Sequence, residues 1–191
     1  MITGLGWPAK FRIGVCVVNR QIKFLPIVAA IAAGAALALA SPIIARPAQQ
    51  ALGQLLTGQR YDAIPMRRLA SNHQVVSVSV NGRPALFLVD SGAAGTVIDR
   101  NQLGRFGIGG SLREGSGIGA GGSIRVSLHN LDSFRIGGQS VPLGQIVSTD
   151  LSGVIAGLRA GDVAGVLGQD VLTRFSGVID VRGGILYLKL R

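Results

Sequence analysis

The sequence predicts an all-β domain made of short strands, and three features favour that class. Glycine supplies 29 of the 191 residues without a Gly-X-Y period, which indicates many tight turns. Strand-length apolar runs recur between these glycines from residue 71 onward and leave little room for long helices. The hydrophobic content is 48% and the charged content only 15%, which is enough for a core of ordinary size. We therefore expect one small closed barrel or sandwich plus N-terminal extras, because typical domains contain roughly 100–150 residues.

The first 40 residues have the character of a targeting segment. Residues 1–23 are basic and contain no acid, whereas residues 24–40 are apolar throughout and end in Ala38-Leu39-Ala40, the small-x-small pattern of a signal-peptidase site. These 17 residues are at the short limit for a membrane-spanning helix, which usually needs about 20. A cleaved signal peptide and an uncleaved helix that anchors the chain in the inner membrane both remain open. Either one predicts that the rest of the chain is exported to the periplasmic or extracytoplasmic side.

Residues 41–70 are predicted to be a linker or pro-segment with a short helix over 47–56, and residues 71–191 to form the domain. The first hairpin of the domain is well marked, since Val76, Val78 and Val80 alternate with serines. Asn81-Gly82 favours a type I′ turn into a return strand over 83–89. The later elements expected are a strand at 96–99, a helical turn near 101–106, strands at 124–128, 133–136, 141–148 and 163–168, a helix at 169–175 and a closing hairpin of 178–181 with 185–190.

A glycine-dense segment covers residues 107–123. Gly117, Gly119 and Gly122 formally match G-x-G-x-x-G. A dinucleotide site requires that pattern to open a helix after a strand, but here it leads into the alternating strand at 124–128. We therefore expect a hairpin tip at this place and exclude a Rossmann-type nucleotide site.

Charge and composition exclude several other functions. The net charge is +10, but from Ser41 onward 15 Lys+Arg stand against 9 Asp+Glu, scattered and without aromatic partners. A nucleic-acid surface would need clustered basic residues, so no nucleic-acid partner is expected. Cys16 is the only cysteine, which excludes a disulfide framework and a cysteine metal site within one mature chain. His73 and His129 are too few for a metal site or a Ser-His pair, and each is expected on a strand surface or in a turn.

The main candidate for chemistry is the stretch Leu86-Phe87-Leu88-Val89-Asp90-Ser91-Gly92-Ala93. Four apolar residues indicate a buried strand, and it ends at a carboxylate that is costly to place beside apolar surface unless it is hydrogen-bonded. Ser91 offers a hydroxyl beside the acid, and Gly92 lets the backbone pass close to another group. A plain Asp-Ser-Gly turn, in which the aspartate accepts backbone hydrogen bonds, is the structural alternative.

This stretch resembles the retropepsin-like aspartic proteases when it is combined with Gly165-Val166-Leu167-Gly168-Gln169-Asp170, about 75 residues later. That family carries Asp-Thr/Ser-Gly-Ala after an apolar strand, then a glycine-rich flap, an apolar-apolar-Gly strand, a short helix and a closing hairpin. Here the flap corresponds to residues around 112–126, and the resemblance covers roughly residues 72–190. It implies an all-β, single-lobe fold with a flap hairpin and one short C-terminal helix, preceded by the N-terminal hydrophobic helix.

The resemblance also implies an activity and a set of site residues. A second Asp-Thr/Ser-Gly is absent, so the family's two-carboxylate, water-activating dyad would form at a homodimer axis with one Asp90 from each chain. Asp99, Asp170 and Asp180 are expected instead to pair with arginines or to cap turns. The substrate would be a peptide or protein, with no metal or other cofactor. The implied supporting residues are Ser91, Gly92 and Ala93 beside the acid, Gly117, Ile118, Gly119, Ala120 and Gly121 in the flap, and Val166, Leu167 and Gly168 in the second motif.

Two rival interpretations stand beside the aspartic endopeptidase that the resemblance implies. The same fold could serve as a non-catalytic peptide-binding or assembly module, with Asp90 as a structural strand-end group, since fold does not dictate activity. A basic membrane-surface or nucleic-acid protein rests on charge alone. The intact Asp90-Ser91-Gly92 favours the enzyme, because a binding module has no need of a carboxylate in an apolar setting.

Overall fold

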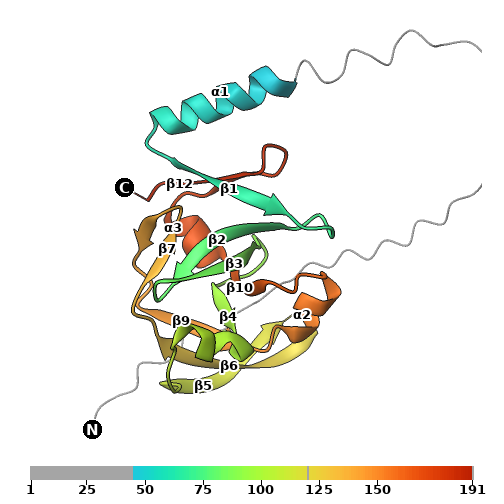
Figure 1. The fold of residues 1–191 in the computed structure, drawn as a ribbon, viewed down its shortest axis with the longest axis vertical. Helices are drawn as coiled ribbons and strands as arrows, with labels where there is room; N and C mark the ends of the chain where they lie inside the picture. Colours follow the sequence, from blue (N-terminus) through green and yellow to red (C-terminus); the bar gives the residue numbers. More distant parts are fainter. Residues whose placement is uncertain (1–44, 120, 191) are drawn as a thin grey trace, which may run out of the picture.

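The structure is a computed structural model that describes residues 45–119 and 121–190 (Figure 1). The predicted signal peptide or anchor, residues 1–40, lies outside them. Within the described ranges, no helix is long and apolar enough to cross a membrane. The elements in chain order are α1 (Ala45–Gly58), β1 (Asp62–Arg68), β2 (Gln74–Val80), β3 (Arg83–Val89), β4 (Val97–Asp99), the 3₁₀ helix η1 (Arg100–Phe106), β5 (Arg113–Gly119), β6 (Gly122–Asn130), β7 (Phe134–Ile136), β8 (Gln139–Val141), β9 (Gln145–Thr149), α2 (Ser152–Gly157), β10 (Val163–Leu167), α3 (Gln169–Arg174), β11 (Val178–Asp180) and β12 (Ile185–Leu188).

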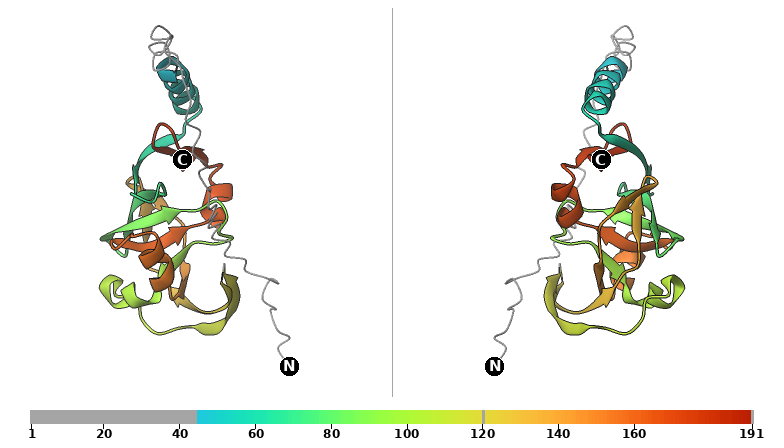
Figure 2. Two further views of the ribbon diagram at one scale, coloured as in Figure 1. Left: turned by 90° about the vertical axis from the view of Figure 1, so that its right-hand side faces the viewer. Right: turned by 90° about the vertical axis from the view of Figure 1, so that its left-hand side faces the viewer.

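The strands form one sheet with the order β11-β12-β1-β2-β3-β10-β4-β9-β6-β5. β7 lies beside β2 and carries β8 at its other edge. Figures 1 and 2 show α1, β1 and β12 at one end of the molecule and the β5–β6 hairpin at the opposite end. The mostly β class predicted from the sequence is confirmed, as are the short helix within residues 47–56, the helical turn near 101–106, the helix after β10 and the closing β11–β12 hairpin.

The β2–β3 turn is confirmed as the predicted type I′ turn and also ties three segments together. Asn81 and Gly82 have φ of 48° and 77°, the two positive values that this turn requires. The Asn81 side-chain oxygen accepts hydrogen bonds from the N–H groups of Asp132 and Ser133, at 2.9 and 3.1 Å. The Asn81 amide nitrogen donates to the carbonyl of Phe106 at 3.1 Å. One turn residue therefore joins the hairpin to η1 and to the segment before β7.

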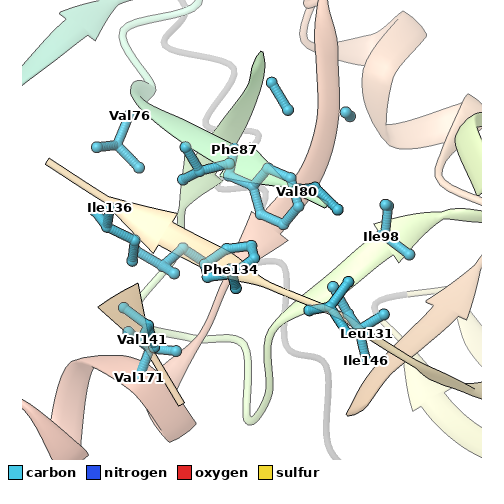
Figure 3. Packing of buried hydrophobic residues seen from close by; sticks show 14 of the residues in the cluster. Val76, Val80, Phe87, Ile98, Leu131, Phe134, Ile136, Val141, Ile146 and Val171 are labelled. Carbon is cyan, nitrogen blue, oxygen red and sulfur yellow. The ribbon is translucent and has the colours of Figure 1, made fainter. Parts of the chain in front are cut away.

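The strand that leads to Asp90 is buried on both faces, which explains its continuous apolar run. Phe87 belongs to one apolar cluster and Leu88 to a second, with exposures of 0% and 2%. In the first cluster the rings of Phe87 and Phe134 meet edge to face, with centroids 5.5 Å apart (Figure 3). The second cluster includes Ala93, so the core continues from β3 to the residues that follow Asp90.

Part of the predicted linker is a strand. β1 lies between β12 and β2 and pairs with both. The sequence pattern did not indicate it, because Ile64 is the only buried residue of β1 and Pro65 follows it directly. Residues 62–68 therefore contribute to the sheet rather than to a spacer.

Two further differences concern residues 139–157. The single strand predicted over 141–148 is divided into β8 and β9, because Pro142 has no N–H to donate to a ladder. The helix α2 was not predicted, since its six residues include two glycines.

Just before α2, the side chain of Asp150 accepts hydrogen bonds from the N–H and the hydroxyl of Ser152, and these bonds lower the pKa of Asp150.

The glycine-dense segment forms the expected hairpin. β5 and β6 are antiparallel and pair from Arg113 with Leu128 to Gly119 with Gly122. The three glycines of the G-x-G-x-x-G match lie on these two strands and do not open a helix. Ala120, which the sequence analysis placed in the flap, lies outside the described residues.

The two histidines differ in their environments. His73 is half-buried in the turn before β2, as predicted, with Nδ1 3.0 Å from the carbonyl of Ser71. His129 was predicted on a strand surface or in a turn, but it is only 4% exposed. Its Nδ1 lies 3.0 Å from the carbonyl of Gly109 and its Nε2 lies 2.9 Å from the hydroxyl of Ser148. Because both nitrogens have partners, the ring can be buried without cost to its polar atoms.

Candidate active site

The candidate site lies where β3, β10 and β4 are neighbours in the sheet. β10 runs parallel to β3 on one side and antiparallel to β4 on the other. Asp90 directly follows β3, and its N–H donates to the carbonyl of Leu167, the last residue of β10, at 3.1 Å. The backbone then turns through residues 91–96 into β4. The fold therefore brings the Asp90-Ser91-Gly92-Ala93 stretch and the second motif, Val166-Leu167-Gly168, into direct contact.

The Asp90 carboxylate has one satisfied oxygen and one unsatisfied oxygen. Oδ1 accepts a hydrogen bond from the Gly92 N–H at 2.8 Å, the Asx-turn geometry expected of an Asp-Ser-Gly sequence. Oδ2 is buried and accepts no hydrogen bond from the described residues. A buried carboxylate oxygen without a donor is costly, and such an atom in a native structure calls for an explanation in terms of function. Asp90 is therefore held in place through one carboxylate oxygen while the other has no donor among the described residues.

Two glycines allow this close approach: Gly165, which lies in β10, and Gly168, which directly follows β10. A Cβ on Gly168 would lie 2.4 Å from the carbonyl carbon and oxygen of Gly95, and a Cβ on Gly165 would lie 2.4 Å from the carbonyl oxygen of Val97. Such separations are impossible for real atoms, so only glycine lets the strand and the loop after Asp90 pack against each other. Steric contact with Gly95 thus explains why the second motif has a glycine at position 168.

A buried hydroxyl connects the end of the loop to α3. Thr96 is 2% exposed, and its Oγ1 donates to Oδ1 of Asp170 at 2.7 Å while accepting from the Gly168 N–H at 3.1 Å. Asp170 also accepts from the Val171 N–H at 2.8 Å. The Thr96 hydroxyl, the Gly168 N–H and Oδ1 of Asp170 therefore all have partners. Neither the role of Thr96 nor this network is predicted from the sequence, although a threonine directly before an apolar strand and an aspartate at a helix start are both recognisable signals.

Gln169 makes two contacts with the loop. Its N–H donates to the carbonyl of Ala93 at 2.8 Å, and its side-chain Nε2 donates to the carbonyl of Ser91 at 2.7 Å. Its Oε1 accepts from the hydroxyl of Thr173, one turn further along α3, at 2.8 Å. Gln169 belongs to the stretch 165–170 that carries the resemblance, but no role for its side chain is predicted from the sequence.

Three other aspartates, Asp99, Asp170 and Asp180, make structural hydrogen bonds. Asp99 caps η1 by accepting from the Asn101 N–H at 3.3 Å, and Asp180 accepts from the Gly183 N–H at 2.7 Å in the β11–β12 turn. Asp170 belongs to the Thr96 network described above. The expectation that these aspartates pair with arginines or cap turns is confirmed, as capping, for Asp99 and Asp180, whereas Asp170 accepts a hydrogen bond from Thr96 instead. Within residues 45–119 and 121–190, no cluster of three or more His, Cys, Asp or Glu is arranged to hold a metal ion.

The flap shares a core with the site but not a hydrogen bond. Val126 of β6 is packed in the same buried cluster as Ala93, and Ile124 packs against that cluster. Near the tip, Gly117 is buried, Ile118 is 49% exposed and Gly121 is exposed. None of the hydrogen bonds among the described residues joins these tip residues to Asp90.

Comparison with known proteins identifies one family. The family model described as aspartyl protease matches residues 76–171. Among solved structures, a retropepsin-like aspartic protease from Rickettsia conorii is similar at 20% identity and a TM-score of 0.48, over 66% of this chain and 98% of that one. The EIAV protease in complex with the inhibitor HBY-793 is similar at 18% identity and a TM-score of 0.43, over 53% of this chain and 86% of that one. No curated protein matches the chain. The resemblance to retropepsin-like aspartic proteases is thereby confirmed.

Proposed function

Because the chain belongs to the aspartyl protease family, we propose that it is an endopeptidase whose catalytic carboxylate is Asp90. The single observation that carries the proposal is the state of this carboxylate. Gly92 holds Oδ1, and the buried Oδ2 has no donor among the described residues. A turn aspartate with a purely structural role would be expected to have both oxygens satisfied or exposed to water.

The proposed reaction is general acid–base hydrolysis by two carboxylates that share one proton. The ionised carboxylate takes a proton from a water molecule, and the water oxygen attacks the peptide carbonyl carbon. The protonated carboxyl gives its proton to the carbonyl oxygen, and a tetrahedral diol forms. The carboxyl that took the water proton then protonates the amide nitrogen, a diol hydroxyl returns a proton to the other carboxylate, and the C–N bond breaks to release the amine and the new carboxyl product. Two carboxylates in close contact favour this arrangement because both cannot ionise easily.

The second carboxylate is proposed to come from a second copy of the chain. Within the described residues, the other aspartates at this part of the fold are already occupied, since Asp99 caps η1 and Asp170 is bonded to Thr96. A two-fold axis beside Asp90 would place the same residue of each chain on both sides of it. Oδ2 would then gain a partner, and the two flaps would cover an extended peptide held by strand-like hydrogen bonds.

The proposed place of action is outside the cytoplasm, either free after signal cleavage or tethered by residues 24–40. Support comes from the sequence of residues 1–40, with its basic start, apolar run and Ala38-Leu39-Ala40 ending.

The test compares the full chain with its Asp90→Asn variant on an unbiased peptide library at several pH values, with the oligomeric state recorded. Cleavage by the wild-type dimer and not by the variant would support the proposal. A folded wild-type dimer that binds peptides but cleaves none would instead support the non-catalytic peptide-binding module.

A further inference from the structure

One peptide unit of the site is hydrogen-bonded at both of its polar ends. The N–H of the Ser91–Gly92 peptide donates to Oδ1 of Asp90 at 2.8 Å, and the carbonyl of the same peptide accepts from Nε2 of Gln169 at 2.7 Å. The Gln169 side chain thus touches the peptide that touches the carboxylate. Because the Ser91–Gly92 peptide is planar and rigid, a movement of the Gln169 side-chain amide also moves the N–H that holds Asp90.

The orientation of the Gln169 amide is determined by chemistry. A carbonyl oxygen can only accept, so the NH₂ group must face Ser91 and Oε1 must face the Thr173 hydroxyl, which can donate. The donors then follow one another in one direction, from Thr173 through Gln169 and the Ser91–Gly92 peptide to Asp90. Hydrogen bonds arranged in this way polarise one another, which strengthens the last donor in the series.

The backbone of Gln169 makes its side chain an effective support. Its N–H is bonded to the carbonyl of Ala93 at 2.8 Å, so the base of the side chain cannot shift away from the loop. The main chain and the side chain of one residue therefore hold the carbonyls on either side of Gly92.

We propose that Gln169 is a positioning residue that fixes the Asp90 carboxylate and, with Thr173, polarises the Gly92 N–H toward it. The proposal rests on the proposed function for its kinetic consequences, but its structural consequence is independent of activity. Gln169, Thr173 and Ser91 are all exposed, so the bonds between them contribute little to overall stability. A loss of the amide should consequently affect the carboxylate much more than the fold.

The experiment uses the full chain with three variants. Gln169→Leu removes both amide groups, Gln169→Glu keeps an acceptor for Thr173 but places an anion against the Ser91 carbonyl, and Thr173→Val removes only the first bond. Gln54→Leu is the matched control, because Gln54 is exposed on α1 and its side chain makes no hydrogen bond within the described ranges. The readouts are kcat and KM across pH, hydrogen exchange of the Gly92 amide, and the melting temperature.

We expect Gln169→Leu and Gln169→Glu to lower kcat by about tenfold or more, since small misplacements of a reacting group have effects of this size, while KM changes little. The acidic limb of the pH–rate profile moves to higher pH, because the carboxylate loses support for its negative charge. In both Gln169 variants the Gly92 amide exchanges faster, and the melting temperature falls by less than about 4 °C. Thr173→Val changes each readout in the same direction but by a smaller amount.

An unchanged pH profile together with unchanged Gly92 exchange in both Gln169 variants would overturn the proposal. A fall in kcat that merely follows a large loss of folded protein would overturn it as well. If the wild-type chain and Asp90→Asn prove equally inactive, the proposed function fails, but Gly92 exchange still decides whether Gln169 positions the loop.

Discussion

A Cβ on Gly168 would lie 2.4 Å from both the carbonyl carbon and the carbonyl oxygen of Gly95. The backbones of two residues far apart in the chain are thus in direct contact, at the point where β10 ends and the loop after Asp90 returns to the sheet. The Gly168 N–H is used in the same junction, since it donates to the hydroxyl of Thr96 at 3.1 Å. The second motif therefore supports the aspartate loop mechanically, by contact and by hydrogen bonds.

Gly168→Ala should destabilise the protein and displace this loop. The added methyl group meets backbone atoms that cannot rotate away, and overpacking of this kind typically costs about 1–3 kcal/mol. Denaturant unfolding measures that loss, and peptidase activity should fall further than the folded fraction does. Gly161→Ala is the control, because a Cβ there meets nothing within 4 Å, and its free energy of unfolding should change by less than about 1 kcal/mol.

Thr96→Val should destabilise through lost hydrogen bonds rather than lost volume. The valine side chain has nearly the same shape but leaves the buried Gly168 N–H without its acceptor and removes one of the two donors to Asp170. A buried donor without a partner costs about 1–3 kcal/mol. Thr96→Ser keeps the hydroxyl and should retain most of the stability, so equal unfolding free energies for the valine and serine variants would contradict this account of the junction.

The sequence predicts the features that depend on contacts between residues close together in the chain, and it misses those that depend on contacts between distant residues. The β2–β3 hairpin, the β5–β6 hairpin and the buried strand before Asp90 each depend on neighbours in the sequence, through the Asn81-Gly82 turn or an apolar pattern. Such local signals are enough to predict where the loop that follows Asp90, residues 91–96, lies in the chain.

Features that depend on distant contacts could not be obtained this way. β1 is a strand because β2 and β12 supply partners on both sides, although its own pattern has one buried residue. His129 is buried because the carbonyl of Gly109 and the hydroxyl of Ser148, both distant in the sequence, supply hydrogen-bond partners for its two ring nitrogens. The role of Gln169 depends likewise on the parallel pairing of β3 and β10, which brings α3 to the Ser91 carbonyl.

Asp90→Asn should abolish hydrolysis and leave the fold nearly unchanged. The amide oxygen can still accept from Gly92, but the side chain can no longer hold or release the proton that the dyad shares. Hydrolysis rates and thermal unfolding measured on the same preparations separate the two effects. Asp162→Asn, which changes an exposed acid of a loop, should keep full activity, and detectable turnover in Asp90→Asn would remove Asp90 from the mechanism.

Activity should be greatest at mildly acidic pH and should fall on the alkaline side. The pair of carboxylates works only while it keeps one proton, so removal of that proton at higher pH leaves no general acid. The profile of kcat/KM against pH, measured with a neutral peptide, reports this directly. A rate that continues to rise above about pH 8 would show that a different group performs the acid step.

The central claim, that one active site requires two copies of Asp90, is tested most directly by mixing subunits. Wild-type and Asp90→Asn chains are combined in equal amounts under conditions that allow exchange, and the specific activity per total protein is compared with that of the pure wild type. If the site forms at a dimer axis, only about a quarter of the dimers carry two aspartates, and the activity should fall to about a quarter. If it falls only to about a half, each wild-type chain acts by itself, and the shared-dyad account is contradicted.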